Sequence, residues 1–203
     1  MNIPNHQEFL KGCKEFEKHE KRDAMYKVAT FLVSYFWGKP SYMADGLGVL
    51  LLTWNQAFYR YGIFNFDKLE KCITDNLEKI ENFRNRDIYS LSNSDEGDIK
   101  DLFIKFLEAL QIDSGNVRGR KSPVAVAKAL HLLAPKFFPL WDDKIAKAYK
   151  CYYNENPADK YVSFCKITKA IGDEVKNYIN PSDKTLIKLI DEYNYSKYTQ
   201  RWI

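Results

Sequence analysis

One segment, SPVAVAKALHLLAPKFFPLWDDKIAKAY at residues 122–149, constrains the fold more than any other part of the chain. Between Pro123 and Ala134 only Lys128 and His131 are polar. A helix that is apolar on nearly all sides is normally buried, so the chain must supply other elements to surround this one. A buried ammonium is unfavourable unless it is paired or loses its proton. Lys128 therefore either extends to the surface along its stem or has a specific role, whereas His131 is expected to be a hydrogen-bonded core residue.

Hydrophobic spacing and end signals predict helices along the rest of the chain as well. The expected helices cover residues 6–37 (as one helix or two), 42–61, 65–83, 95–110, 123–134, 143–153, 158–178 and 182–195. No repeat, low-complexity tract or linker divides the sequence. These features predict an all-α fold in which residues 1–203 form a single domain, with two helical lobes as an alternative.

Composition points to a globular protein inside the cell: 45% of the residues are hydrophobic and 29% are charged. The first residues show no apolar signal segment, and the longest apolar run, GLGVLLL at 46–52, is too short to cross a bilayer. We therefore expect an intracellular, cytoplasmic protein without membrane contact. The four cysteines form no CxxC pair and the three histidines are scattered, which argues against a metal site or an iron–sulfur cluster.

Charge is distributed unevenly along the sequence. Residues 115–150 hold eight Lys and Arg against two Asp, whereas residues 65–113 hold seven Lys and Arg against twelve Asp and Glu. A local basic segment favours a polyanionic partner, although a solvated basic loop would look the same. The basic segment opens with a glycine-containing loop that leads into a helix N-terminus, where free N–H groups bind anions. The expected phosphate clamp consists of Arg118, Gly119, Arg120, Lys121 and Ser122.

The order of elements at 115–153 is a basic loop, a helix, a short connector with an internal proline, and an Asp that starts the next helix. In FPLWDDKI that Asp is Asp142, preceded by Trp141 and followed three residues later by Ile145. Over about 35 residues this layout resembles the helix–hairpin–helix DNA glycosylases, the superfamily of endonuclease III and the 8-oxoguanine glycosylases. The loop lacks the family's usual PGVG pattern.

The resemblance implies hydrolysis of the N-glycosidic bond of a base flipped out of duplex DNA, with Asp142 as the essential carboxylate and no cofactor. The residue chemistry agrees, because such a reaction needs a carboxylate near the sugar and a site that holds the backbone. The alternative is that Asp142 only caps a helix, which is the commonest role of Asp at such a position.

The family's nucleophilic lysine, where present, falls at Val124 in an ungapped match, which favours a monofunctional enzyme that uses water. Lys128 lies one turn further on the same helix face, and helical side chains lean toward the N-terminus. Its amine is therefore an alternative nucleophile, and Lys121 in the loop is another. The structural alternative for Lys128 is an ion pair or a stem that reaches solvent.

A second unusual run, TWNQAFYRYG at 53–62, adds candidates for a base pocket. Trp54 belongs first to an expected core stripe with Phe58 and Tyr61, while Asn55 and Tyr59 share a neighbouring face. The predicted base pocket consists of Trp54, Asn55, Tyr59 and Trp141.

Together these features predict a monomeric DNA glycosylase for damaged or modified bases. A non-catalytic nucleic-acid-binding protein and a helical protein-interaction module are the rivals. The sequence leaves open whether the target base is oxidised, alkylated, deaminated or hypermodified, and whether the role is repair or defence.

Overall fold

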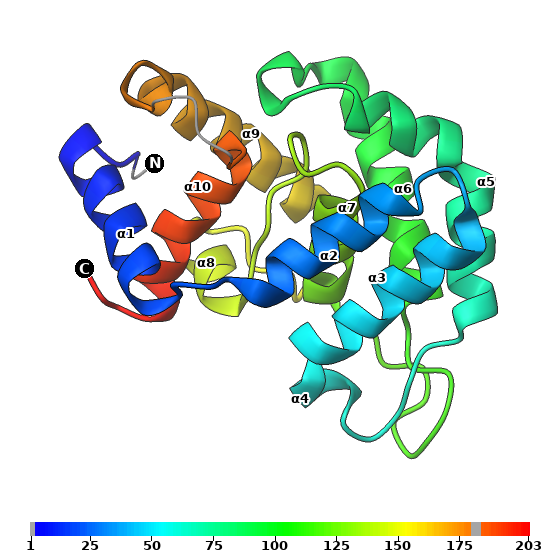
Figure 1. The fold of residues 1–203 in the computed structure, drawn as a ribbon. Coiled ribbons are helices and arrows are strands. Elements are labelled where there is room, and N and C mark those ends of the chain that lie inside the picture. The colour runs from blue at the N-terminus through cyan, green and yellow to red at the C-terminus, as the bar shows by residue number, and fades with distance from the viewer. Residues whose placement is uncertain (1–2, 180–183) are drawn as a thin grey trace.

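The computed structural model describes residues 3–179 and 184–203, and this part of the chain is helical without any β-strand. The predicted all-α class is therefore confirmed. Figure 1 shows the arrangement of the helices, which are α1 (His6–His19), α2 (Ala24–Tyr35), α3 (Pro40–Trp54), α4 (Gln56–Tyr59), α5 (Phe66–Arg84), α6 (Glu96–Ala109), α7 (Pro123–Leu133), α8 (Asp143–Ala148), α9 (Pro157–Val175) and α10 (Leu186–Asn194). A π-helical turn, Tyr195–Thr199, continues directly from α10.

Side-chain caps fix where several of these helices begin. Asn5, Asn65 and Thr185 each accept a hydrogen bond from the backbone N–H three residues later. Ser122 caps α7 in the same way, with Pro123 at the first helical position, and Asp142 caps α8. These residue types are favoured N-caps because their side-chain oxygen satisfies a backbone donor that the helix leaves unpaired.

Helix α7 occupies the middle of the molecule, in contact with α2, α3 and α6 (Figure 1). Its fully enclosed residues are Ala125, Val126, Ala127, Ala129, Leu130, His131, Leu132 and Leu133. This confirms the prediction that the apolar segment needs neighbours on nearly every side.

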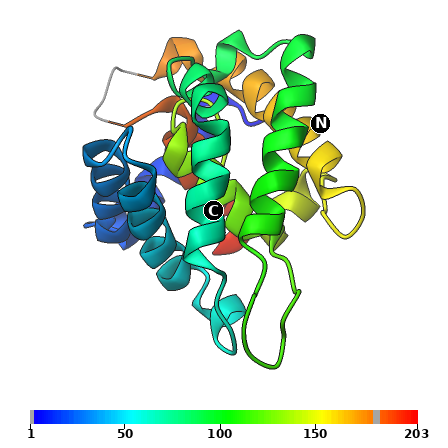
Figure 2. The same ribbon diagram turned by 90° about the vertical axis from the view of Figure 1, so that its right-hand side faces the viewer.

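The remaining helices pack into two groups on either side of α7 (Figures 1 and 2). In one group α3 packs against both α2 and α5, and α5 packs against α6. In the other, α10 packs between α1 and α9, while α8 contacts the π-helical turn. Contacts between α6 and α9 join the groups, and one continuous cluster of buried side chains runs through both.

Several helix boundaries differ from the expected ones. The segment 6–37 forms two helices, one of the two expected arrangements, and the chain turns between them at Asp23, whose φ of 40° is left-handed. The segment 42–61 breaks at Asn55, and α8 ends at Ala148 instead of 153. The expected start of the last helix at 182 lies outside the described residues, and the helix is described from Leu186 onward. Tyr61, expected in a core stripe, is 66% exposed.

The connection between α6 and α7 is a long loop that projects beyond the helices beside α4 (Figures 1 and 2). Two backbone hydrogen bonds close its base, from Ile112 to Arg120 and from Gly119 to Ile112, at 2.9 and 2.7 Å. Gly115 has a φ of 83°, and a Cβ there would lie 2.2 Å from the carbonyl oxygen of Tyr61. This loop is much longer than a tight hairpin, so the helix–hairpin–helix element expected at 115–153 remains a prediction.

Candidate functional site

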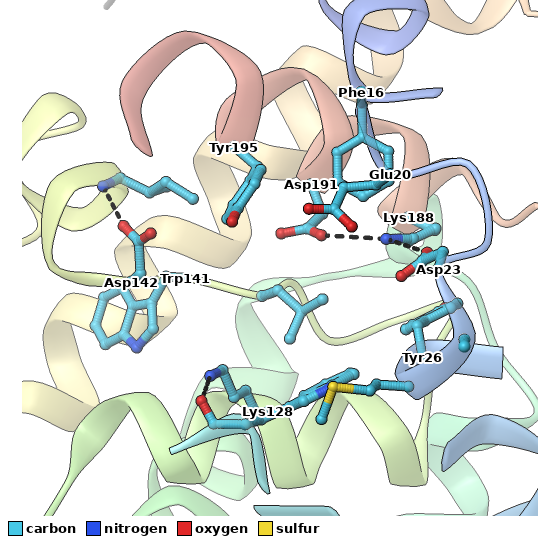
Figure 3. Close-up of a pocket in the computed structure, with 15 residues that line it drawn as sticks. Phe16, Glu20, Asp23, Tyr26, Lys128, Trp141, Asp142, Lys188, Asp191 and Tyr195 are labelled. Carbon is cyan, nitrogen blue, oxygen red and sulfur yellow. Dashed lines mark hydrogen bonds and ion pairs between the residues drawn. The ribbon is translucent and has the colours of Figure 1, made fainter. Parts of the chain in front are cut away.

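A cavity of about 380 Å³ opens between the two groups of helices. Its walls come from the end of α1, the start of α2, the end of α3, the middle of α7, the connector before α8, and α10 (Figure 3). The lining residues are Phe16, Glu20, Asp23, Ala24, Met25, Tyr26, Trp54, Lys128, Leu140, Trp141, Asp142, Ile145, Lys188, Asp191 and Tyr195. The volume lies within the range of pockets that hold small organic groups.

Lys128 brings its amine into this cavity from the middle of α7 (Figure 3). Its Nζ donates to the carbonyl oxygen of Trp54 at 2.9 Å and to Oδ1 of Asn55 at 2.7 Å. Both partners are uncharged, and burial lowers the pKa of Lys128 to about 8, although Asp191 and Asp142 act in the opposite direction. An amine with a pKa of about 8 is neutral, and therefore nucleophilic, far more often at neutral pH than an ordinary lysine, which is what amine catalysis requires.

Asp142 lines the same cavity and also caps α8 (Figure 3). Its Oδ1 accepts from the backbone N–H of Ile145 at 2.8 Å, and its Oδ2 accepts from the hydroxyl of Thr199 in the π-helical turn. The carboxylate is therefore held rigidly at the cavity wall. Capping and a place in the cavity coexist in this one side chain, so the two roles weighed for Asp142 from sequence are not exclusive.

A cluster of charges forms the wall that α10 and the α1–α2 connection provide. Lys188 lies 2.9 Å from Asp23, 3.6 Å from Asp191 and 3.8 Å from Glu192. Its ammonium also lies 4.5 Å from the ring centres of both Phe16 and Tyr26. Burial would lower the Lys188 pKa, but the negative charges of Asp191 and Asp23 outweigh it, and the pKa is raised.

Asp191 is a carboxylate of this wall that accepts no hydrogen bond from the described residues. Its side chain is 16% exposed, and its closest charged neighbour is Lys188 at 3.6 Å. Burial, together with the charges of Asp142 and Asp23, raises the pKa of Asp191 to about 6 against the opposing effect of Lys188 and Lys128. A carboxyl group whose pKa lies this close to neutrality can exchange a proton under ordinary conditions.

His131 lies outside the cavity lining and contacts one of its residues, Tyr26. It is fully buried, its Nδ1 lies 2.8 Å from the carbonyl oxygen of Phe138, and its Nε2 lies 3.1 Å from the Tyr26 hydroxyl. Because a carbonyl only accepts, Nδ1 carries the proton and Nε2 accepts from Tyr26. Burial lowers the pKa of His131 to about 4, so the ring stays neutral. The prediction of a hydrogen-bonded core histidine is confirmed.

The four residues predicted for a base pocket separate in the structure. Trp54 and Trp141 line the cavity, and the Trp54 ring lies parallel to Tyr26 with the ring centres 6.3 Å apart. The Oδ1 of Asn55 accepts a hydrogen bond from the Lys128 amine, and its buried Nδ2 has no hydrogen-bond partner among the described residues. The prediction that Tyr59 belongs to the pocket is wrong. Tyr59 is buried away from the cavity and its hydroxyl donates to the carbonyl oxygen of Leu110, because the turn at Asn55 rotates α4 relative to α3.

The predicted phosphate clamp lies on the projecting loop, outside the cavity. Arg118 is exposed, with Asp113 3.6 Å away, and Arg120 is also exposed. Lys121 pairs with Glu108 of α6, and Ser122 is buried as the cap of α7. Lys121 is absent from the cavity lining, as is Val124, the position of the family's usual lysine.

Sequence reasoning missed the residues that α1, α2 and α10 contribute to the cavity. Lys188, Asp191 and Tyr195 lie at helical spacing opposite the apolar face of LIKLIDEY, a pattern that normally marks a solvated face. Asp23 gave no signal in the sequence, and its left-handed backbone is visible only in the structure. Such strain in a non-glycine residue often accompanies functional positions.

Among residues 3–179 and 184–203, His, Cys, Asp and Glu form no group that could hold a metal ion. No helix in the same part of the chain has the length and apolar character needed to cross a membrane. Comparisons of the chain with protein-family models, curated proteins and solved structures found no match. The function must therefore be argued from the cavity and its chemistry.

Proposed function

We propose that this protein is a DNA glycosylase that removes a modified base flipped out of the duplex into the cavity. The observation that carries the proposal is that the Lys128 amine and the Asp142 carboxylate line one cavity. A lysine with a lowered pKa beside a fixed carboxylate supplies the nucleophile and the negative charge that cleavage of an N-glycosidic bond needs.

In the proposed reaction the neutral Lys128 amine attacks C1′ of the deoxyribose, and the C1′–N bond breaks with its electron pair going to the base. The Asp142 carboxylate stabilises the positive charge that develops on the sugar. The nitrogen then loses a proton and its lone pair forms the C=N bond as the C1′–O4′ bond breaks. O4′ takes the electron pair and the proton, so the ring opens to a hydroxyl and a protonated Schiff base between Lys128 and C1′. The sequence favours water as the nucleophile because of Val124, but Lys128 lines the cavity, and its pKa is lowered whereas that of Lys188 is raised, which supports the amine of Lys128.

DNA binding is the second part of the proposal. A base can enter the cavity only if the backbone is held nearby while the base leaves the stack. The exposed Arg118 and Arg120, together with the net positive charge of residues 115–150, support contacts between the projecting loop and phosphates.

A duplex with a single abasic site tests the amine without knowledge of the target base, because its aldehyde carbon is the same C1′. Borohydride reduces a Schiff base to a stable adduct. We expect a covalent protein–DNA adduct with the wild type, none with Lys128→Gln, and an adduct with Lys121→Ala, the matched control on the loop. Loss of the adduct in Lys121→Ala and its persistence in Lys128→Gln would assign the amine to the loop instead.

A panel of duplexes, each with one oxidised, alkylated, deaminated or hypermodified base, then identifies the target by base release. Asp142→Asn should lower release by roughly 10²-fold or more, because an uncharged amide cannot oppose the sugar's charge. Its stability should change by about 1 kcal/mol or less, since Asn caps helices nearly as well as Asp. A wild type that binds DNA but neither traps nor releases anything would be a non-catalytic binding protein in which Lys128 only caps the end of α3.

A further inference from the structure

The two carboxylates that act on the Lys128 amine differ in what already occupies their oxygens. Both oxygens of Asp142 accept hydrogen bonds, one from Ile145 and one from Thr199. Within the described part of the chain, Asp191 accepts no hydrogen bond, and its nearest cation is Lys188 at 3.6 Å, a distance too long for one. Asp191 therefore has free lone pairs at the cavity, whereas Asp142 is engaged in fixing its own position.

Resting on the proposed function, we propose that Asp191 is a second catalytic carboxylate, which accepts a proton from the Lys128 ammonium and passes it to the departing base. Figure 3 shows the arrangement that supports this: Asp191 enters from α10 and Lys128 from α7, on facing walls of the cavity. The base would lie between them when C1′ is within reach of the amine.

The proton and electron balance of this step closes without any other reactant. The ammonium of Lys128 gives one proton to the Asp191 carboxylate and becomes a neutral amine. The amine lone pair forms the bond to C1′ as the C1′–N bond breaks, and its electron pair goes to the base nitrogen. The carboxyl proton of Asp191 then moves to that nitrogen, so the base leaves neutral and Asp191 is a carboxylate again.

The surroundings of Asp191 suit a group that gains and loses a proton. The titratable groups that face it are Glu20, Asp23, Tyr26, Lys128, Asp142, Lys188 and Tyr195. The carboxylates Asp142 and Asp23 disfavour its charge and the two lysines favour it, while burial disfavours it most strongly, which places the Asp191 pKa at about 6. With Lys128 at about 8, one proton resides on the pair between these values.

This arrangement predicts a bell-shaped dependence of base release on pH. Below about pH 6 both groups carry protons, so no base accepts the ammonium proton. Above about pH 8 neither group carries one, so no acid protonates the leaving base. If Lys128 acted without a proton carrier, the rate would instead rise with pH through the amine's pKa and then stay level.

The test is single-turnover base release across pH, from the duplex that the panel identifies, for the wild type, Asp191→Asn and the control Glu192→Gln. Glu192 is the matched control because it is buried beside Lys188 on the same helix but does not line the cavity. We expect Asp191→Asn to lose roughly 10²-fold or more at pH 7, the usual contribution of a general acid–base group, and to lose the alkaline fall. Glu192→Gln should keep both limbs of the bell.

The outcomes separate the two proposals. An active wild type with a level alkaline limb, or an Asp191→Asn variant that keeps the bell, would overturn the role of Asp191 and leave the glycosylase intact. If Glu192→Gln loses the bell in the same way, Asp191 acts only through the position of Lys188. A wild type that releases no base and traps no abasic site overturns both. The wild-type profile decides the point even if Asp191→Asn does not fold.

Discussion

Two lysines enter the same cavity from opposite walls, and the structure treats them in opposite ways. Lys188 is 4% exposed and lies near three carboxylates and two aromatic rings, and its pKa is raised. Lys128 is half-buried against the carbonyl of Trp54 and the amide of Asn55, and its pKa is lowered to about 8. Burial lowers the pKa of both ammonium groups, so the difference comes from the charge of their partners.

This difference separates an amine suited to hold structure from one suited to react. A lysine paired with carboxylates stays protonated and links the elements that carry its partners, here the α1–α2 connection and α10. A lysine held by neutral oxygens can lose its proton near neutral pH and use its lone pair. The four changes below test this contrast, in order of decreasing effect.

Replacement of Lys188 by Met should have the largest effect. It leaves Asp23, Asp191 and Glu192 without their shared cation, and loss of one partner of a buried ion pair costs about 3–5 kcal/mol. Urea unfolding at pH 7 measures the change, with Lys128→Met as the matched comparison. If both Met variants unfold at the same urea concentration, the two lysines do not differ in structural role.

Replacement of Asn55 by Asp should make Lys128 resemble Lys188. A carboxylate in place of the amide oxygen that now lies 2.7 Å from Nζ should raise the Lys128 pKa by about 1–3 units. Base release at pH 7 should fall, because the ammonium gives up its proton less readily, and the alkaline limb, which Lys128 sets, should move to higher pH. Asn55→Ala removes the hydrogen bond without adding charge and should not raise the pKa. An unchanged pH profile in Asn55→Asp would mean that partner charge does not set the state of Lys128.

Replacement of Lys128 by Met should leave a folded protein that is at least as stable as the wild type at pH 7. The folded pKa of about 8 lies below the ordinary 10.5, so the folded state carries its full penalty for the ammonium below about pH 8 and loses it as pH rises toward 10.5. The shift corresponds to about 3 kcal/mol, offset by two lost hydrogen bonds of about 1 kcal/mol each.

Thermal unfolding across pH should therefore show the stability of Lys128→Met relative to the wild type shrinking between about pH 8 and 10.5. A difference that stays constant over this range would show that the Lys128 pKa is not lowered. The control is Lys71→Met, which replaces an exposed lysine of α5. Its stability relative to the wild type should not change between about pH 8 and 10.5.

Replacement of both Arg118 and Arg120 by Ala should have the smallest effect of the four changes. Each lost phosphate contact should flatten the dependence of log binding constant on log salt by about one unit, so about one to two in total. Fluorescence anisotropy with a duplex across salt concentrations measures this. Lys71→Ala, in the acidic part of the chain, should leave the slope unchanged. An unchanged slope in the double variant would place the backbone contacts away from the projecting loop.

Much of the fold could be read from local pattern. The 122–149 segment predicted a buried helix, its start at Ser122 and Pro123, and the next start at Asp142, and the structure has all three. The segment 42–61 was read as one helix because its apolar periodicity continues past Asn55, but the turn there separates α3 from α4 and sends Tyr59 into the core. The turn at Asn55 alone decided this outcome, and the spacing of the apolar residues around Asn55 does not reveal that turn.

The residues of the candidate site also fall into those that the sequence identifies and those that it does not. Lys128 and Asp142 stood out in the sequence because each breaks a strongly apolar segment, and the structure brings both to one cavity. Asp23, Lys188 and Asp191 were not identified, because charged residues at helical spacing also mark an ordinary solvated face.

The sequence by itself determined which segments are helical, that α7 must be buried on nearly every side, and that a lysine lies on that helix. Only the tertiary structure decided that Lys128 meets neutral oxygens while Lys188 meets carboxylates, and that Asp191 lies across the cavity from the amine. The physical reason is that helical periodicity is a local property of neighbouring residues. A pKa depends on burial and on charges within a few ångströms, and those charges come from helices far apart in the chain.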